Sequence, residues 1–345
     1  MLMPQTRLTE GPLLDGRGRL AMAGWATAPV RVYDRARIAA PRRRIKEWDY
    51  YLISDGSRAL ALTIDDNAYM GMLSASWLDL GAAAERTVSR INPLPLGRTH
   101  LPPSAAAGTC FLKNGRSFGR FVTEDGVRRL RFRMENFSAG AALSADLTLT
   151  DPPRDSMVIA TPFAEDPRAF YYNQKIVGMR ASGTVELGAE RYGFAPDRAF
   201  ALLDWGRGVW TYENTWFWSA AMGELGGETF GFNLGYGFGD TSAASENMIF
   251  CGGTAHKLAA VDFGIPQRDG RDDYLSPWHF TSSDGRFEAE FRPTLDRAAR
   301  TDLRLILSDQ HQVFGRFSGR AVLDDGTERL FRDLPGFAEK VHNKW

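Results

Sequence analysis

Recurring Asp-Gly pairs are the feature that most constrains how this chain folds. Several stand between segments in which apolar and polar residues alternate, and they occur at Asp15-Gly16, Asp55-Gly56, Asp125-Gly126, Asp269-Gly270, Asp284-Gly285 and Asp325-Gly326. An Asp-Gly pair tolerates the positive φ angles of tight hairpins, so such a pair predicts a strand, a turn and a second strand. Helix-like stretches are short and interrupted by Gly or Pro. The sequence therefore predicts an all-β fold, a mostly antiparallel barrel or sandwich.

The length of 345 residues suits two ordinary domains or one large one. A turn-rich break occurs at residues 151–155, and a fresh strand pattern begins at Gly183. We place the boundary near residue 180, which predicts two domains, 1–180 and 181–345, each built as a barrel.

Charge gives no global reason to bind a polyanion. Lys plus Arg and Asp plus Glu both number 42, so no overall field recruits nucleic acid or an anionic membrane. One basic run, residues 42–46, stands out. It fits either a solvated surface segment or a seat for an anionic headgroup or phosphate, and both interpretations remain open.

Cysteine usage and hydropathy indicate a soluble, cytoplasmic protein. Cys110 and Cys251 show neither a Cys-x-x-Cys spacing nor a neighbouring His, so we expect buried thiols in a reducing compartment. The N-terminal residues lack an apolar stretch of signal-peptide length. No run approaches the roughly 20 apolar residues of a transmembrane segment.

The glycine-rich stretch from Gly235 to Gly239 looks like a phosphate loop but lacks its context. A dinucleotide site needs a third glycine at the right spacing and a helix behind it, and a Walker loop needs a Gly-Lys-Ser/Thr ending. The five histidines show no ligand spacing either. We therefore expect no nucleotide, metal or other cofactor.

The alternation of residue types between even and odd positions explains these glycines better than a phosphate loop does. In residues 230–239 the even positions are large and apolar, and the odd positions are four glycines and, at 233, Asn. Side chains alternate between the two faces of a strand, so one face is apolar and the other is nearly bare backbone. Glycine inside a strand usually marks a bend or the close approach of another group. We predict a curved strand with something large against its flat face.

Residues 210–218 supply a second aromatic face. Its even positions are Trp210, Tyr212, Asn214, Trp216 and Trp218, and glycines 223, 226 and 227 mark the turn that follows. If the register aligns, the aromatic faces of the two strands form one surface. That surface is either a filled barrel core or an apolar pocket with orienting polar groups at Asn233 and Tyr236.

Several motifs carry a resemblance to a known family. They are residues 203–210 (Leu-Asp-Trp-Gly-Arg-Gly-Val-Trp), 216–218, 233–240, 246–247, 47–51, 172–175 and 336–339. Across nearly the whole chain the sequence resembles the bacterial family called domain of unknown function 2804. More remotely it resembles the lipocalin-like, or calycin-like, two-barrel proteins that include hydroxyneurosporene synthases, which are carotenoid hydratases. That resemblance implies two lipocalin-like antiparallel barrels. In the hydratases Asp is followed by an acidic residue and Trp, whereas here Trp205 follows Asp204 directly.

The polar residues near these motifs are the candidates for chemistry. Asp204 is either a general acid in an aromatic pocket or the partner of Arg207 in a bracing ion pair. Asp240 and Glu246 are either acid/base groups at a barrel mouth or turn caps, and His279 is catalytic or structural. The candidate ligand-binding residues are Trp205, Arg207, Trp210, Trp216, Trp218, Asn233, Tyr236 and Asn247.

Two functions from different classes remain. The first is a metal-free acid/base hydratase, cyclase or isomerase that acts on a bulky apolar small molecule, such as a lipid, an isoprenoid or a polyketide-like compound. The second is a lipid-binding carrier or sensor without catalysis. A protein whose second barrel only braces the first is the structural alternative. Carboxylates gathered at an aromatic site favour the enzyme.

Overall fold

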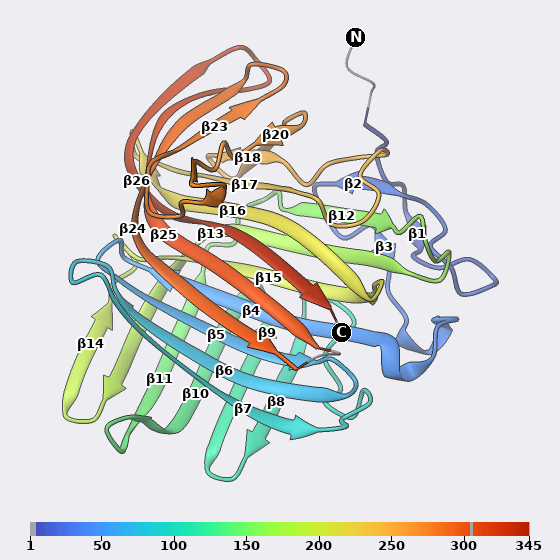
Figure 1. The fold of residues 1–345 in the computed structure, drawn as a ribbon, viewed down its shortest axis with the longest axis horizontal. Coiled ribbons are helices and arrows are strands. Elements are labelled where there is room, and N and C mark those ends of the chain that lie inside the picture. The colour runs from blue at the N-terminus through green and yellow to red at the C-terminus, as the bar shows by residue number, and fades with distance from the viewer. Residues whose placement is uncertain (1–4, 304–305, 345) are drawn as a thin grey trace.

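The computed structural model describes residues 5–303 and 306–344 and is built almost wholly from strands (Figure 1). Its helical segments are two single 3-10 turns, η1 (Arg35–Arg37) and η2 (Arg42–Arg44). The predicted all-β, two-barrel fold is confirmed, with one nearly closed barrel and one half-barrel.

The first sheet forms the nearly closed barrel. Its main path runs β7-β6-β5-β4-β15-β13-β11-β10-β9-β8. These strands are β4 (Ile45–Ser54), β5 (Arg58–Asp66), β6 (Met70–Asp79), β7 (Ala84–Pro93), β8 (Gly108–Asn114), β9 (Ser117–Glu124), β10 (Val127–Ser138), β11 (Ala141–Thr150), β13 (Phe170–Leu187) and β15 (Phe200–Val209). Three further strands pair beside this path, β2 (Gly24–Ala26), β12 (Met157–Pro162) and β14 (Glu190–Phe194).

The second sheet forms the half-barrel, in the order β19-β18-β17-β16-β26-β25-β24-β23-β20. These strands are β16 (Glu213–Leu225), β17 (Glu228–Tyr236), β18 (Met248–Cys251), β19 (Thr254–Lys257), β20 (Val261–Asp262), β23 (Trp278–Ser282), β24 (Phe287–Asp302), β25 (Leu307–Val322) and β26 (Glu328–Lys344). Two small pairs complete the fold, β1 (Gly11–Pro12) with β3 (Arg31–Val32) and β21 (Gln267–Arg268) with β22 (Arg271–Asp272).

The Asp-Gly pairs lie in hairpin turns, as predicted. Five of the six join consecutive antiparallel strands: β4–β5, β9–β10, β21–β22, β23–β24 and β25–β26. The sixth, Asp15-Gly16, lies between Leu14 and Leu20, which form an isolated antiparallel bridge.

The predicted domain boundary near residue 180 and the passage from the first sheet to the second lie at different places in the chain. Residues 180 and 181 are inside β13, which pairs with β11, β12, β14 and β15 of the first sheet. The chain passes to the second sheet only between Val209 and Glu213. The strand pattern at Gly183 continues β13 after Gly178, where the register shifts and φ is +95°, so a bend within one strand resembled a new beginning.

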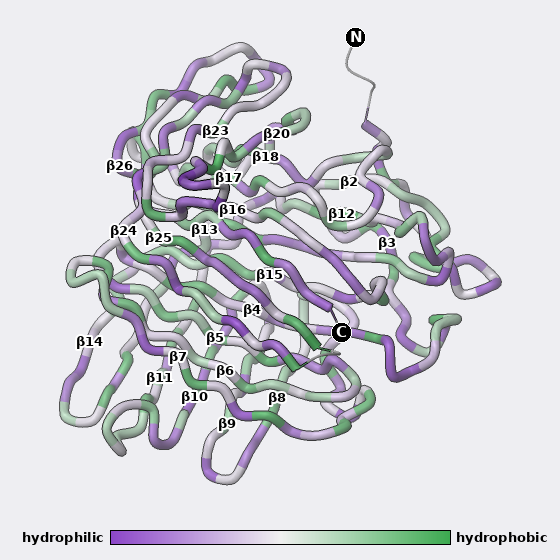
Figure 2. Tube along the Cα trace, viewed as in Figure 1, coloured by the Kyte–Doolittle hydropathy of each residue, from purple (hydrophilic) through white to green (hydrophobic). Residues whose placement is uncertain are grey.

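Apolar side chains form three cores. One fills the first barrel, one fills the half-barrel, and one lies between the two sheets. Hydropathy alternates along many strands accordingly (Figure 2). The core between the sheets receives one face from each sheet, and this arrangement positions the candidate site.

Candidate functional site

Strand β15 separates two environments. Its odd residues, among them Leu203 and Trp205, join the core of the first barrel, and its even residues, among them Leu202, face the second sheet. Asp204 is even, so it lies between the sheets, where it is 7% exposed.

Neighbouring strands add polar groups to the same face. On β13, Asn173 and Lys175 pair with Gly206 and Asp204 of β15. On β4, Tyr50 pairs with Asp204, and Trp48 pairs with Gly206. Directly paired residues of adjacent strands share a face, so these side chains converge between the sheets.

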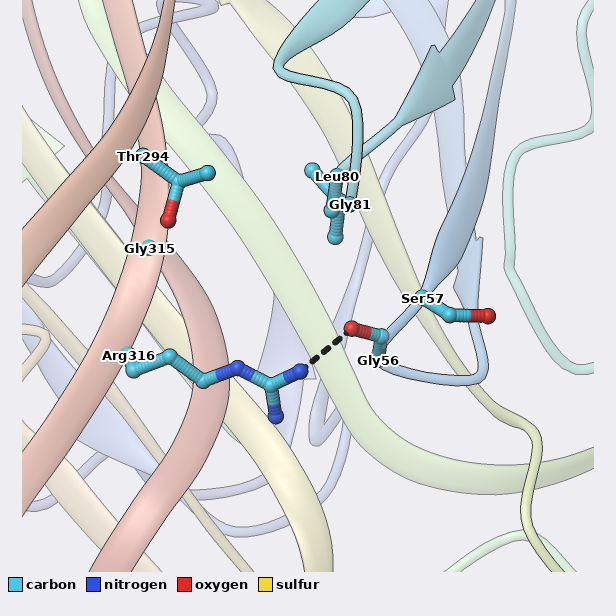
Figure 3. Close-up of a pocket in the computed structure, with 7 residues that line it drawn as sticks. All are labelled: Gly56, Ser57, Leu80, Gly81, Thr294, Gly315 and Arg316. Atoms are coloured by element: carbon cyan, nitrogen blue, oxygen red, sulfur yellow. Dashed lines mark hydrogen bonds between the residues drawn. The ribbon is translucent and has the colours of Figure 1, made fainter.

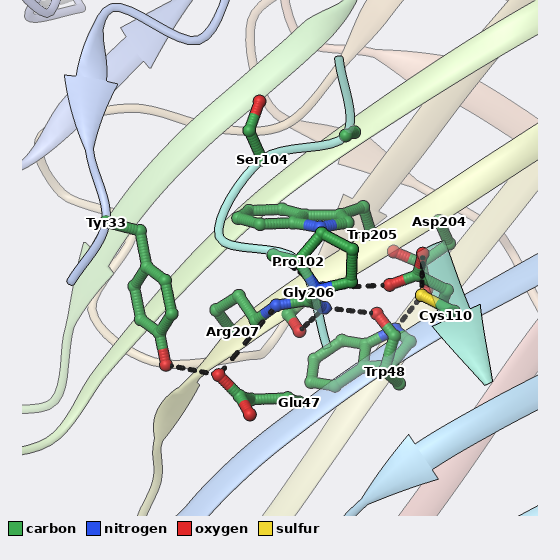
Figure 4. Close-up of polar contacts among 12 residues, drawn as sticks. Tyr33, Glu47, Trp48, Pro102, Ser104, Cys110, Asp204, Trp205, Gly206 and Arg207 are labelled. Atoms are coloured by element: carbon green, nitrogen blue, oxygen red, sulfur yellow. Dashed lines mark hydrogen bonds and ion pairs between the residues drawn. The ribbon is translucent and has the colours of Figure 1, made fainter. Parts of the chain in front are cut away.

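Asp204 accepts hydrogen bonds from three side chains of the first sheet. Lys175 Nζ lies 3.1 Å from its Oδ1, and Asn173 Nδ2 donates to the same oxygen at 2.6 Å. The indole Nε1 of Trp48 donates to Oδ2 at 3.0 Å (Figure 4). The carboxylate is thereby oriented by an ion pair and two neutral donors.

Lys175 connects this carboxylate to the second sheet. Its ammonium lies 3.7 Å from Glu246 Oε2 and 4.0 Å from the centre of the Trp218 ring. Trp218 Nε1 donates to Asn233 Oδ1 at 2.8 Å, and Asn233 Nδ2 donates to Glu246 Oε2 at 3.2 Å. One polar network therefore spans both sheets.

A third carboxylate, Glu339 on β26, completes this network. Trp216 Nε1 donates to its Oε1 at 2.9 Å, and Gln312 Nε2 donates to its Oε2 at 2.9 Å. Desolvation raises the pKa of Glu339 above its ordinary value, although the hydrogen bond from Trp216 and the charges of Arg297 and Lys175 oppose the shift. Burial thus favours the protonated form of Glu339.

Aromatic rings enclose these polar groups. Trp48 stacks on Tyr171, with 6.0 Å between ring centres and 11° between planes, and it lies 5.2 Å from Trp210. The ring of Phe238 packs against those of Tyr171, Trp210 and Trp216, with 4.8–5.3 Å between ring centres. We call the whole set the interface cluster: Trp48, Tyr171, Asn173, Lys175, Asp204, Trp210, Trp216, Trp218, Asn233, Phe238, Glu246 and Glu339.

The phenol of Tyr171 stays protonated within the cluster. Burial raises its pKa well above the usual value, and the charges of Asp204, Glu246 and Glu339 raise it further. Trp48, Trp216, Glu246 and Glu339 are only partly buried, so the cluster reaches the surface at these side chains.

The glycines make room for this assembly, as their parity predicts. A Cβ on Gly235 would lie 2.5 Å from the Glu246 carboxylate, and one on Gly231 would lie 3.2 Å from Val177 of the first sheet. On β15, a Cβ on Gly206 would lie 1.9 Å from the Trp48 ring. The bare strand faces therefore admit side chains from elsewhere in the fold.

The proposed ion pair between Asp204 and Arg207 is wrong, because residues three apart on a strand lie on opposite faces. Arg207 is fully buried in the first barrel, where it bonds Asp49 Oδ1 at 2.9 Å and the carbonyls of Trp48, Gly206 and Pro102 (Figure 4). Trp205 lies there too, 4.2 Å from the Arg207 guanidinium.

The two predicted aromatic faces also do not form one surface. Trp218 pairs with Gly235, and Phe217 pairs with Tyr236. Trp216 and Trp218 therefore share a face with the glycines, whereas Tyr236 points into the half-barrel and stacks on Phe217, with 4.4 Å between ring centres. Phe238 returns to the interface because Gly237 has a φ of +90°, which breaks the alternation.

Other candidates lie outside the interface cluster. Asp240 is exposed in a turn, where the hydroxyl and amide of Ser242 lower its pKa. His279 is exposed on β23, where its Nε2 lies 3.8 Å from Glu288 Oε1. Asn247 is buried and bonds the backbone of Gly235 and Ala259, which is a bracing role. Cys110 and Cys251 are free and buried, as predicted.

Sequence reasoning gave no role to five members of the interface cluster: Trp48, Tyr171, Asn173, Lys175 and Glu339. Four of them stand inside motifs that carry the family resemblance, residues 47–51, 172–175 and 336–339. Their position inside these motifs was a signal in the sequence, but no feature of the individual segments indicates that the segments come together in the fold.

A cavity of about 140 Å³ lies elsewhere between the sheets (Figure 3). Gly56, Ser57, Leu80 and Gly81 line it from the first sheet, and Thr294, Gly315 and Arg316 line it from the second. None of its lining residues is a predicted site residue. Within residues 5–303 and 306–344, no group of three or more His, Cys, Asp or Glu side chains could hold a metal ion.

The fold and the interface cluster define a class: two-barrel β-proteins with a polar, tryptophan-rich centre between their sheets. The chain belongs to the family named Domain of unknown function (DUF2804), whose model matches residues 5–345. No curated protein matches the sequence.

Two solved structures are similar in fold. A protein assigned as AttH from Nitrosomonas europaea is 15% identical, with a TM-score of 0.54, over 92% of this chain and 98% of its own. Kievitone hydratase from Nectria haematococca is 11% identical, with a TM-score of 0.54, over 97% of this chain and 98% of its own. None of the helices in the described part of the chain has the length and apolarity that a bilayer crossing needs.

Proposed function

We propose that the protein is an acid/base enzyme that adds water to, removes water from, or isomerises a bulky apolar, unsaturated small molecule at the interface cluster. One observation carries the proposal: three carboxyl groups and one lysine converge among tryptophan rings between the two sheets. Apolar surroundings with few oriented polar groups are typical of small-molecule sites.

Two of the three carboxyl groups suit different roles in acid/base chemistry. Glu339 has a raised pKa and suits the acid that protonates a carbon–carbon double bond. Asp204, held by Lys175, Trp48 and Asn173, suits the base that accepts a proton from the attacking water. Protonation breaks the O–H bond of Glu339 and the carbon–carbon π bond and forms a C–H bond. Water then forms the C–O bond and gives up one of its two protons to Asp204.

The fold of kievitone hydratase gives this class of reaction a precedent on two barrels. At 11% identity the likeness concerns the fold, so the proposal rests on the side chains of the interface cluster. A non-catalytic carrier of the same ligand is the alternative, since the aromatic wall alone would bind an apolar compound.

The test begins with mass spectrometry of small molecules that co-purify with the protein. Each compound is then incubated with the protein in water labelled with oxygen-18. A hydratase incorporates one labelled oxygen, an isomerase rearranges the compound without incorporation, and a carrier returns it unchanged. Unchanged compounds throughout would contradict the enzyme proposal and favour the carrier.

The variant Glu339→Gln separates chemistry from binding. It keeps the size of the side chain and one acceptor oxygen but cannot deliver a proton, so kcat falls by about 100-fold or more while ligand binding persists. Asp240→Asn is the matched control, because Asp240 is an exposed turn residue, and its activity remains that of the native protein. Equal activity of the two variants would remove Glu339 from the mechanism.

A further inference from the structure

The outer wall of the first barrel concentrates positive charge on β8, β9 and β10. Burial alternates along residues 127–135 of β10, where Arg129 and Arg131 are exposed and Leu130 and Phe132 are buried. Six outward residues of these strands form what we call the basic face: Phe111, Lys113, Arg120, Arg129, Arg131 and Arg133. Glu124 and Glu135 also lie outward, and Glu135 pairs with Arg133 at 2.8 Å. Figure 2 shows hydrophilic segments along these strands.

The register places like charges against each other on this face. Arg120 of β9 is the direct cross-strand partner of Arg131 of β10. Like charges directly opposite each other on one face of a sheet are unfavourable. Asp146 offsets Arg131 at 3.3 Å, but Lys113, Arg120 and Arg129 form no ion pair within the described residues. An external anion would remove this repulsion.

An exposed apolar group stands among these charges. Phe111 is the cross-strand partner of Arg120 on β8, and its side chain is 47% exposed. Ile91 on the neighbouring β7 is also 47% exposed, and its carbonyl accepts a bond from Asn114 at the end of β8. Basic side chains around a protruding aromatic ring suit an anionic membrane surface, where charge attracts and the ring enters the headgroup region.

The charge on this face is local. The whole chain has a formal net charge of zero, so the field is felt within about one Debye length, about 8–10 Å at physiological salt. Within the described part of the chain, the core between the sheets draws no residue from β8, β9 or β10. The basic face is therefore free to meet a partner while the two sheets stay packed.

We propose that the basic face docks the protein on an anionic lipid bilayer, with Phe111 inserted among the headgroups. A single exposed ring does not make the series of stacking platforms that single-stranded nucleic acid uses. A bilayer also dissolves the apolar compounds that the interface cluster is proposed to bind. Docking and acid/base chemistry use different residues, so each can fail without the other.

The experiment is co-sedimentation of the full chain with vesicles of phosphatidylserine and phosphatidylcholine, compared with phosphatidylcholine alone. Binding is expected only to the anionic vesicles and is expected to weaken as salt rises. The triple variant Arg120→Gln, Arg129→Gln and Arg131→Gln should bind roughly 100-fold more weakly, at roughly fivefold per basic side chain. Phe111→Ser should weaken binding at every salt concentration.

The matched control removes three arginines from the second sheet: Arg292→Gln, Arg300→Gln and Arg332→Gln. It should bind vesicles like the native protein, because all three residues lie outside the basic face. Equal binding to neutral vesicles, or equal loss in the two triple variants, would overturn the proposal. Tighter binding of a single-stranded oligonucleotide, lost in the first triple variant alone, would assign the face to nucleic acid instead.

Discussion

At the scale of single residues, Gly206 shows how one missing side chain positions a catalytic candidate. The Trp48 ring lies over this glycine, and its indole donates to Asp204. Gly206→Ala places a methyl group 1.9 Å from that ring, so Trp48 must move. We expect a loss of about 1–3 kcal/mol of unfolding free energy, the usual cost of overpacking.

Chemical denaturation of Gly206→Ala checks this expectation, with Gly193→Ala as its control. Gly193 is also a strand glycine, and a Cβ there would have nothing within 4 Å. Similar losses of unfolding free energy in the two variants would show that any strand glycine gives this effect when it is replaced, and that contact with the Trp48 ring is not its cause.

A second prediction concerns Asp65, which is buried on β5 and accepts a bond from the Met72 amide at 2.7 Å. Burial raises its pKa from 3.8 to about 8, against the lowering effects of that amide and of Lys46. Between these values the folded state binds more protons than the unfolded state, so the contribution of Asp65 to stability is lost as the pH rises. Asp65→Asn should remove this loss.

Denaturation at pH 5 and pH 8 measures the effect. Relative to the native protein, the variant should gain stability from the lower pH to the higher. The buried Lys46, whose pKa burial lowers to about 7, acts in the opposite sense above neutrality, where stability rises with pH, so the comparison stops at pH 8. A constant difference between the two proteins would contradict the prediction.

At the scale of elements, β16 presents different partners on its two faces. Trp218 contacts Tyr50 of the first sheet, with 6.0 Å between ring centres, whereas its neighbour Phe217 stacks on Tyr236 inside the half-barrel. Double-mutant cycles to alanine should give a coupling of about 0.5–1.5 kcal/mol between Trp218 and Tyr50. The cycle between Phe217 and Tyr50 should give none, and equal couplings would refute the assignment of faces.

The faces of each strand could be predicted from the sequence, but the register between strands could not. Parity sorts residues 230–236 into apolar and bare sides, as the structure confirms, whereas Phe238 departs from the pattern. The turn at Gly226 and Gly227 joins Leu225 to Glu228, so the even residues of β16 share a face with the odd residues of β17. Because glycines occur at 223, 226 and 227, the sequence left the exact position of this turn open. A shift of the turn by one residue would move every side chain of one strand to the opposite face of the sheet.

At the scale of the whole molecule, Lys175 joins the two sheets. It lies 3.1 Å from Asp204 on its own sheet and 3.7 Å from Glu246, which belongs to the second half of the chain. Lys175→Ala leaves these carboxylates without their cation, and breaking a buried ion pair costs about 3–5 kcal/mol. Adding Glu246→Gln should recover part of that loss, as unfolding curves of the single and double variants would show. A double variant that is less stable than Lys175→Ala would exclude repulsion between the carboxylates as the cause.

The sequence identified Asp204, Trp216, Trp218, Asn233 and Glu246 as candidates, and the structure brings them together. It could not predict that Lys175 and Glu339 join them. These residues come from strands far apart in the chain, and they meet only because the two sheets dock face to face. The chemical character of each residue can be read from the sequence, but the packing of the two sheets against each other depends on the complete fold.

The alternation along β15 has a consequence for how this fold diversifies. The two faces of this strand have separate structural roles. Its odd residues pack in the core of the first barrel, and its even residues form part of the core and the polar network between the two sheets. Substitutions on one face of the strand therefore leave the packing of the other face in place. A lineage can therefore exchange its chemistry while inheriting its architecture, and proteins with 11–15% identity can share the scaffold over nearly their full length.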